Sequence, residues 1–366
     1  MLFFFLVTGA GVLTLSFLFS ESIKGVLNRF NLSEKFVGSS LLATGTSFPE
    51  VINAITAGFY DRESSQKYKY SIDSFYNLTG ASLIQIIFLS GLGIVLYHLT
   101  KKKKFAQSEY RGFITSTFQN KTFLWFLFTA ELVLLLIAVS FPSFSQKIGI
   151  GSVSFLPFLF LVIWACYLVF SRKDKEDFKS YSNIFDQLSN FKFLGIFGFI
   201  FICFSGLSFL NFNIVTMFEK TFRIPRNIGL GTILSLVTSF PEFSSFFFLF
   251  KSRHFGLASA GIFGSALFNL FLPSLTQSIK VGWFLSELVT NSNLQASLIG
   301  WLGLAVALNV IFLIAFYKNK KGNYILNFNY PRWNVFWSWV LLTSYLTISF
   351  IIFPIFLKSE TAGDTK

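Results

Sequence analysis

The chain has 366 residues, of which 53% are hydrophobic and only 13% are charged, and its mean hydropathy is +0.62. A water-soluble core does not carry so apolar a composition, so the sequence predicts an all-α polytopic membrane protein. The net charge is +13, but the basic residues lie in short connections between apolar runs. No nucleic-acid-binding surface has room to fold there, which argues against nucleic acid as a partner.

Apolar runs follow one another along the chain, and we expect about ten transmembrane helices because most runs are close to the roughly 20 residues that cross a bilayer. The runs are 2–19, 36–59, 72–99, 123–141, 150–170, 193–212, 228–250, 256–275, 294–317 and 333–357. The polar stretches between them, such as 20–35 and 100–121, are expected to be loops. We expect a first five-helix unit at 1–170, a connecting loop at 171–192, a second unit at 193–357 and a polar tail at 358–366.

Lysine and arginine are distributed unequally between the two sides of the predicted helices. The connections after odd-numbered runs contain 20 of them, and the opposite side contains 10. Basic loops stay in the cytoplasm. The sequence therefore predicts a multi-pass protein of the cell (inner) membrane, with the 171–192 loop in the cytoplasm and both termini on the other side.

Two of the apolar runs contain the same five residues, TSFPE, at 46–50 and 238–242. Each copy carries a carboxylate, Glu50 or Glu242. An ionised carboxylate at the bilayer centre costs about 2.5–3.5 kcal/mol, so such a residue is by default functional. Because each unit has an odd number of crossings, the second copy should run in the opposite direction to the first. This predicts two inverted five-helix repeats with a site near the midplane.

Each copy also carries a proline, Pro49 or Pro241, which should interrupt its helix because it has no N–H to donate. On helical spacing the glutamates share their faces with small or hydroxyl residues. These are Ala43, Thr46 and Ser47 for Glu50, and Ser235, Thr238 and Ser239 for Glu242. Such oxygen ligands suit Ca²⁺ or Na⁺ and disfavour zinc, copper and iron. The competing interpretation is two kinked helices whose carboxylates extend outward.

The segments 43–50 and 264–269 resemble signatures of the cation/calcium exchanger superfamily, the sodium/calcium exchangers and their bacterial relatives. The resemblance implies that Glu50 and Glu242 are the central cation ligands. It implies that Ser265 and Asn269 complete the site from the following helix. It further implies hydroxyl or backbone oxygens from Thr46, Ser47, Thr238 and Ser239.

In the first repeat the expected counterparts of that second-repeat pair are Ala81 and Gln85, so a hydroxyl is lost and a longer amide side chain is present. Gln85 follows Glu50 by 35 residues, whereas Asn269 follows Glu242 by 27. This assignment requires about eight extra residues around 61–70 in the first repeat.

Together these patterns predict an antiporter that exchanges Ca²⁺ for Na⁺ by alternating access. Its partners would be inorganic cations and the lipid bilayer, and it would need no cofactor and catalyse no reaction. The alternatives are H⁺-coupled exchange, exchange of another cation such as Mg²⁺ or K⁺, and a diverged cation sensor that does not transport. The sequence defines no oligomeric state. Outside the motifs, Glu131 is expected near the cytoplasmic end of its helix with its carboxylate extended to the surface, and His254 at a helix end.

Overall fold

The computed structural model describes residues 2–63, 68–89, 122–143, 149–150, 153–172, 184–222, 235–280 and 292–316, together with 282, 285, 339, 340 and 343. These residues are helical apart from short connections and one antiparallel pair of two-residue strands, β1 (Gly149–Ile150) and β2 (Val153–Ser154). The predicted helical class is therefore confirmed. The predicted loop 100–121 and most of the predicted run 333–357 lie outside the described residues, so the count of ten helices stays a prediction.

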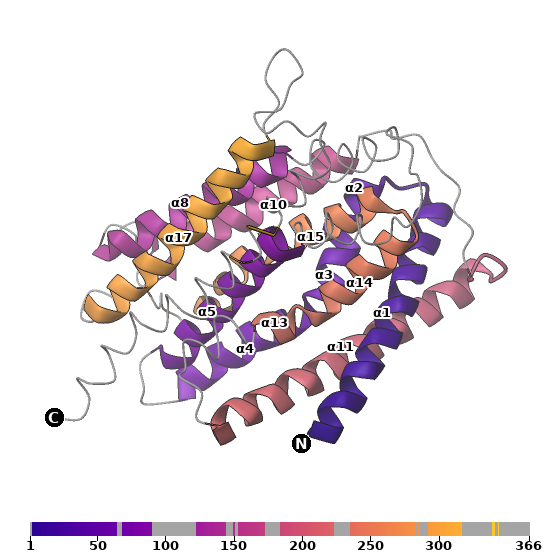
Figure 1. Cartoon of the computed structure of the whole chain (residues 1–366), viewed down its shortest axis with the longest axis horizontal. Helices are drawn as coiled ribbons and strands as arrows, with labels where there is room; N and C mark the ends of the chain where they lie inside the picture. The colour runs from indigo at the N-terminus through magenta and orange to yellow at the C-terminus, as the bar shows by residue number, and fades with distance from the viewer. Residues whose placement is uncertain are drawn as a thin grey trace, which may run out of the picture.

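The helices form a bundle in which two layers enclose the segments that carry the motifs (Figure 1). On one side α1 (Leu2–Phe30) packs along α11 (Asn190–Phe222). On the other side α8 (Thr122–Ser140) packs against α17 (Ser292–Phe316), and α10 (Leu156–Arg172) packs against a central helix, α15 (Phe255–Phe271). The remaining central elements include α4 (Phe48–Glu63), α5 (Lys69–Leu83), the π-helical segment η2 (Ile84–Leu89) and α14 (Phe240–Lys251).

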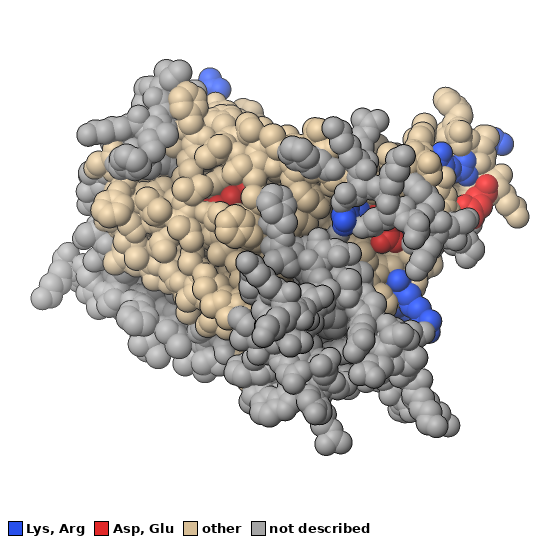
Figure 2. Space-filling view, turned by 90° about the horizontal axis from the view of Figure 1, so that it is seen from above, with Lys and Arg blue, Asp and Glu red and all other residues tan. Residues whose placement is uncertain are grey.

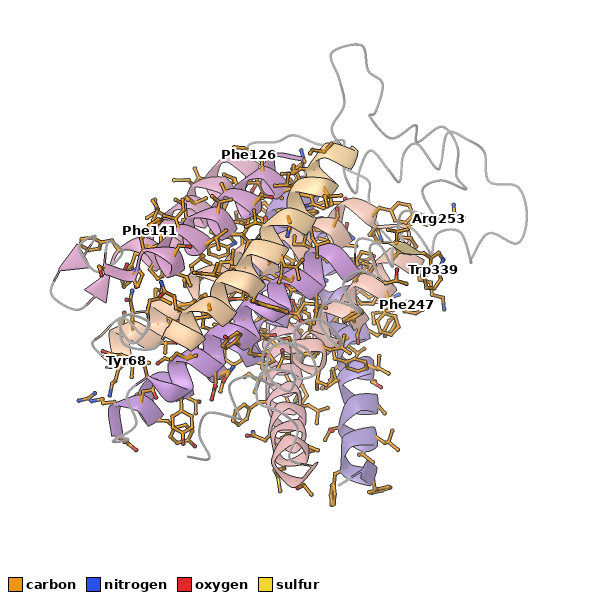
Figure 3. The ribbon with its side chains drawn as sticks, turned by 60° about the vertical axis from the view of Figure 1, so that its left-hand side comes forward. Tyr68, Phe126, Phe141, Phe247, Arg253 and Trp339 are labelled. Carbon is orange, nitrogen blue, oxygen red and sulfur yellow. The ribbon has the colours of Figure 1, made fainter. Side chains whose placement is uncertain are left out.

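The exterior of the bundle is largely apolar. Figure 3 shows Phe126, Phe141 and Phe247 on the outside of the bundle, where they are 58%, 63% and 45% exposed. On the face in Figure 2, charged side chains gather mainly toward one end, and most of the described surface is uncharged. Three described helical stretches are long and apolar enough to cross a membrane, namely Leu6–Phe30, Asn190–Leu207 and Phe255–Lys280. An exposed apolar surface of this extent is what helices present to lipid.

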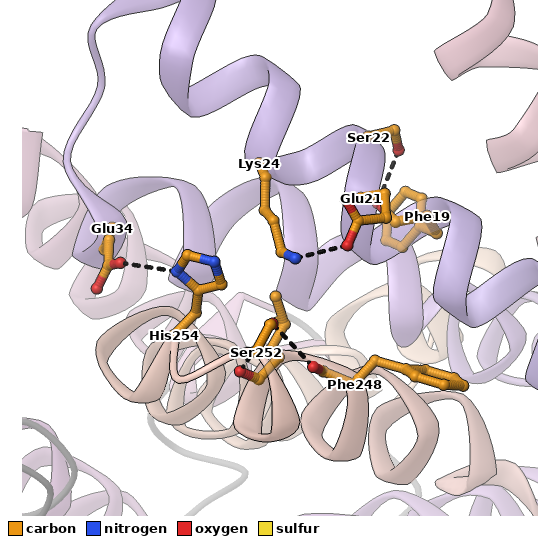
Figure 4. Close-up of polar contacts among 9 residues, drawn as sticks. Phe19, Glu21, Ser22, Lys24, Glu34, Phe248, Ser252 and His254 are labelled. Carbon is orange, nitrogen blue, oxygen red and sulfur yellow. Dashed lines mark hydrogen bonds and ion pairs between the residues drawn. The ribbon is translucent and has the colours of Figure 1, made fainter. Parts of the chain in front are cut away.

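The first helix is longer than the sequence predicts. The stretch 20–35 is expected to be a loop, but α1 continues through it to Phe30. Within this stretch Lys24 Nζ lies 2.5 Å from Glu21 Oε1, and Ser22 donates to the Phe19 carbonyl at 2.7 Å (Figure 4). A count of apolar residues therefore ends this helix too early, because a helix can also contain charged residues that pair with each other.

Both TSFPE segments are broken helices, as their prolines predict. The first copy is preceded by three consecutive helical segments, α2 (Glu34–Val37), η1 (Gly38–Leu42) and α3 (Ala43–Thr46). The last of them stops at Ser47, and α4 begins at the next residue. In the second copy α13 (Ser235–Thr238) ends at Ser239, and α14 follows. Ser47 has φ −86° and ψ 13°, and Ser239 has φ −79° and ψ 4°, so the two breaks share a conformation.

A third break, which the sequence analysis did not predict, separates α15 from α16 (Pro273–Lys280) at Leu272. Pro273 has no N–H for the Asn269 carbonyl, and that carbonyl accepts instead from the Leu272 N–H at 3.3 Å. The run expected at 256–275 is therefore two helices, and its break lies three residues after Asn269.

Contacts along α15 and α16 establish the directions of the two TSFPE segments. A Cβ on Gly38 would lie 2.6 Å from Ala260 Cβ, and farther along Thr276 donates to the Ala54 carbonyl at 3.0 Å. The first segment therefore runs parallel to α15 and α16. Residues 252–254 reverse the chain between α14 and α15. Accordingly α14 runs opposite to α4, the relation that inverted repeats require.

Candidate cation site

The two glutamates of the repeated motif meet in the interior. Glu50 lies in the first turn of α4 and is 0% exposed, and Glu242 lies in the first turn of α14 and is 3% exposed. Each therefore sits at a helix start, where free N–H groups favour negative charge. Ser47, three residues before Glu50, donates to Glu242 Oε1 at 2.9 Å, so the two motifs are in direct contact. Neither carboxylate extends to the surface, which contradicts the interpretation of two merely kinked helices with outward-facing charges.

Hydroxyl groups from both repeats converge on Glu242. Ser47 Oγ donates to Glu242 Oε1 at 2.9 Å, and Ser265 Oγ donates to the same oxygen at 3.2 Å. The Ser47 and Ser265 hydroxyls also contact each other. The Thr46 side chain lies near Glu242, and the Thr238 side chain lies near Glu50. Each carboxylate is thus approached by the threonine of the other repeat.

Several buried polar atoms around the carboxylates have no hydrogen-bond partner in the described structure. They are both Glu50 oxygens, Glu242 Oε2, Ser239 Oγ, and the amide oxygen and nitrogen of Asn269. Buried polar groups in proteins are nearly always paired, so an unpaired group calls for an explanation such as an ion. A cation bound between the carboxylates would satisfy the oxygens. Among the described residues no group of three or more His, Cys, Asp or Glu could hold a metal, so a cation here would rely on two carboxylates and neutral oxygens.

An asparagine that the sequence analysis missed faces the second repeat. Ser235 Oγ donates to the Asn77 carbonyl at 3.0 Å and to Asn77 Oδ1 at 3.3 Å. Thr238 Oγ1 lies 3.5 Å from the same Oδ1. Asn77 follows Glu50 by 27 residues, the same interval as from Glu242 to Asn269. This equal spacing was the signal in the sequence, and with it the eight-residue insertion expected around 61–70 is not needed.

The first-repeat residues expected to match the second-repeat pair occupy other positions. Ala81 and Gln85 are both fully buried, but Gln85 lies in η2, two turns beyond Asn77, and its amide has no partner among the described residues. The structure therefore places Asn77, and not Gln85, against the second TSFPE segment. By the same register Asp73, one turn before Asn77, occupies the position that Ser265 has in the second repeat.

The remaining expected ligands are buried beside the breaks, where part of their hydrogen-bonding capacity is already used. Thr46 Oγ1 donates to the Leu42 carbonyl at 3.0 Å. The Ala43 carbonyl accepts from the Ser47 N–H at 3.0 Å, so one of its two lone pairs is used within the helix. The Ser235 carbonyl likewise accepts from the Ser239 N–H at 3.0 Å. Ala43 and Ser235 therefore contribute hydrogen bonds at the breaks, and their carbonyl oxygens, like the hydroxyl oxygens, retain a lone pair for a cation.

The family model described as sodium/calcium exchanger protein matches residues 1–173 and 192–353. No curated protein matches the chain.

Solved structures of exchangers share the fold. The sodium-calcium exchanger NCX_Mj soaked with 2.5 mM Na⁺ and 0.1 mM Ca²⁺ is 16% identical and has a TM-score of 0.56, over 94% of this chain and 96% of that chain. The H⁺/Ca²⁺ exchanger CAX is 13% identical and has a TM-score of 0.55, over 98% of this chain and 92% of that chain. At these identities the likeness to solved structures establishes the fold, and the family match establishes membership. The chain is a polytopic membrane protein that belongs to the sodium/calcium exchanger protein family.

Proposed function

We propose that this protein is a secondary active antiporter that exchanges Ca²⁺ for Na⁺ across the cell membrane by alternating access. The observation that carries the proposal is the pair of buried glutamates at matched breaks of two antiparallel helices, with three carboxylate oxygens unpaired. Two carboxylates balance the charge of one Ca²⁺. When Ca²⁺ leaves, the pair must be neutralised again, since two buried uncompensated charges are strongly unfavourable. This requirement makes exchange obligatory.

In this proposal Glu50 and Glu242 are the central ligands, and neutral oxygens complete the coordination shell. The neutral ligands are Ser47, Ser265, Thr46, Thr238, Ser239, Asn269 and Asn77. Ala43 and Ser235 hold the backbone at the breaks, and Gln85 is assigned a place outside the shell. Ca²⁺ accepts six to eight oxygens in flexible geometry, whereas Mg²⁺ demands a near-octahedral shell and retains waters. A dry cage of protein oxygens therefore favours Ca²⁺ over Mg²⁺.

The counter-ion is proposed to be Na⁺, with H⁺ as the runner-up. Apart from Asp73, which has the register position of Ser265, the polar side chains placed beside the glutamates are hydroxyls and amides, which are ligands for a hard monovalent cation but do not themselves take up protons at neutral pH. The fold is shared by a sodium-calcium exchanger and by an H⁺/Ca²⁺ exchanger, so fold similarity does not select between the two ions. K⁺ as the exchanged ion, and a sensor that binds without transport, are the remaining alternatives.

Flux in proteoliposomes tests the proposal. We expect ⁴⁵Ca²⁺ uptake driven by an imposed Na⁺ gradient, and its loss in Glu50→Gln and in Glu242→Gln because each variant leaves one carboxylate facing a divalent ion. Glu63→Gln is the matched control, because Glu63 is at the exposed end of the same helix as Glu50. Uptake retained in both central variants would show that Glu50 and Glu242 are not the ligands. Uptake driven only by a pH step would identify H⁺ as the counter-ion, and Ca²⁺ binding without flux under any gradient would favour the sensor.

A further inference from the structure

A third buried carboxylate, Glu131, lies outside the candidate cation site. It sits at the middle of α8, nine residues from each end of Thr122–Ser140, and it is 1% exposed. The expectation that it lies near the cytoplasmic end of its helix and extends to the surface is therefore wrong. A glutamate at the centre of a buried helix face cannot reach water by bending its side chain.

Neither oxygen of Glu131 has a hydrogen-bond partner among the described residues. Among the described helices, α17 and α15 make the main contacts with α8, and neither contains an Asp, Glu, Lys, Arg, His, Tyr or Cys. Glu131 is also the only charged residue of α8 itself. Among the described residues, no counter-charge therefore faces this carboxylate from the helices packed against α8.

Two polar contacts hold α8 on α17 on either side of Glu131. Trp125 Nε1 donates to Asn309 Oδ1 at 3.1 Å, and near the other end Gln295 Nε2 donates to the Val139 carbonyl at 3.0 Å. The Asn309 amide also donates to the Ala305 carbonyl at 2.8 Å. Both ends of that amide are thus already engaged in contacts between and within the helices.

An ionised carboxylate in such surroundings is strongly unfavourable unless it holds a cation or a proton. A metal cation needs several oxygen ligands, whereas no described polar group lies within hydrogen-bond distance of either Glu131 oxygen. We propose that Glu131 is a proton-binding site, occupied by a proton in this conformation and separate from the glutamate pair. The neutral carboxylic acid is compatible with an apolar contact between helices.

Release of that proton requires α8, α15 and α17 to rearrange so that water or a cation reaches the carboxylate. Because α15 also carries Ser265 and Asn269, such a rearrangement would be felt at the candidate cation site. This second step rests on the proposed function, whereas occupancy by a proton does not. We infer that proton release from Glu131 makes exchange depend on pH without using the central glutamates.

Infrared difference spectroscopy tests the occupancy directly on the purified full-length protein at neutral pH. The wild-type minus Glu131→Gln spectrum is expected to contain the C=O stretching band of a protonated carboxylic acid, shifted to lower frequency in D₂O. Glu21→Gln is the matched control, and its difference spectrum should contain carboxylate bands because Glu21 pairs with Lys24 at 2.5 Å. Carboxylate bands for Glu131 would overturn the proposal. Glutamine has nearly the shape of the neutral acid, so the variant is expected to fold.

Flux measurements test the link to exchange. Glu131→Gln is expected to retain Ca²⁺ exchange but to lose part of its dependence on pH. An unchanged pH profile would overturn the link and leave the infrared result standing. Failure of the proposed function would appear differently, as an absence of flux in the wild type or retained flux in the two central variants.

Discussion

At the scale of single residues, the candidate site differs from the sequence prediction chiefly at Asn77. Its backbone and side-chain oxygens accept hydrogen bonds from Ser235, and its Oδ1 also lies within reach of Thr238. Asn77 therefore holds the second broken helix at the level where Glu50 lies. Gln85 makes no contact of this kind, although it is equally buried.

Substitution of these two amides should have unequal effects. Asn77→Ala is expected to lower Ca²⁺ uptake or affinity by about ten- to a hundredfold, the usual effect of losing a group that orients metal ligands, whereas Gln85→Ala should change it much less. Uptake by proteoliposomes at several Ca²⁺ concentrations measures both effects. Ser74→Ala, a small change at another buried position of α5, controls for general damage to the helix. A larger loss in Gln85→Ala than in Asn77→Ala would restore the original assignment.

The predicted glutamates and the missed asparagine were marked in the sequence by different physical signals. Glu50 and Glu242 could be found because a charge in an apolar run is costly and the run recurs. Asn77 carries no charge, and the residues around it, 71–76, do not repeat the letters around Asn269. Only the interval of 27 residues marked it. Hydrogen bonds between the two repeats, such as that from Ser235 to Asn77, depend on packing that no local pattern encodes.

At the scale of helices, a close approach of α15 to the first broken helix brings the two repeats together. Gly264 faces the backbone of Ser39, so that a Cβ at this position would collide with Ser39 Cα. Gly38 and Gly261 make similar approaches from the two sides of the same contact. Small residues are the usual means by which membrane helices pack closely. Through this contact Ser265, the next residue on α15, reaches Ser47.

Adding one methyl group should separate these helices. Gly264→Ala is expected to lower stability by about 1–3 kcal/mol, the usual cost of overpacking a tight contact, because backbone atoms cannot move aside as a flexible side chain can. Gly300→Ala on α17 is the matched control, since nothing lies within 4 Å of the added carbon. Thermal unfolding of the purified protein in detergent would measure both. Equal unfolding temperatures for the two variants would contradict the role assigned to this contact.

Helix boundaries follow from the sequence where a local cause dominates. Pro49 and Pro241 predict the breaks at Ser47 and Ser239 correctly, because the missing N–H acts within one turn. Pro273 carried the same signal for the break at Leu272, but the run of apolar residues around it concealed the signal. The extension of α1 to Phe30 could not be found in this way, since it depends on the pairing of Lys24 with Glu21 inside the bundle.

At the scale of the whole molecule, two sets of polar contacts mark opposite ends of the first broken helix. At one end Glu34 lies 3.7 Å from His254 in the turn that precedes α15 (Figure 4). At the other end Lys280 donates to the Asp61 carbonyl. The Asp61 side chain in turn accepts from the Tyr70 N–H at 2.9 Å and so caps the start of α5. These contacts separate residues 252–254 from residues 61–63 and 68–70 by the length of the broken helix.

The two ends should therefore lie on opposite sides of the membrane, with the basic turn 251–253 in the cytoplasm. In a background with Cys166 and Cys203 replaced by serine, Ser252→Cys and Arg62→Cys each place a single thiol at an exposed position. A membrane-impermeant maleimide added to whole cells should label Arg62→Cys alone, and added to inverted vesicles it should label Ser252→Cys alone.

The outcomes of that experiment separate two arguments. Labelling of both thiols from the same side would contradict the parallel packing of α15 and α16 on the first broken helix, because residues at its opposite ends could not then share a compartment. Labelling with the two sides exchanged would leave the packing intact and overturn only the orientation drawn from lysine and arginine counts. The expected pattern would place Glu34 and His254 at the cytoplasmic end, and Asp61 and Lys280 at the outer end. The glutamate pair would then lie between these two sets of contacts, one near each side of the membrane. Alternating access requires a central site of this kind that can be closed off from either side.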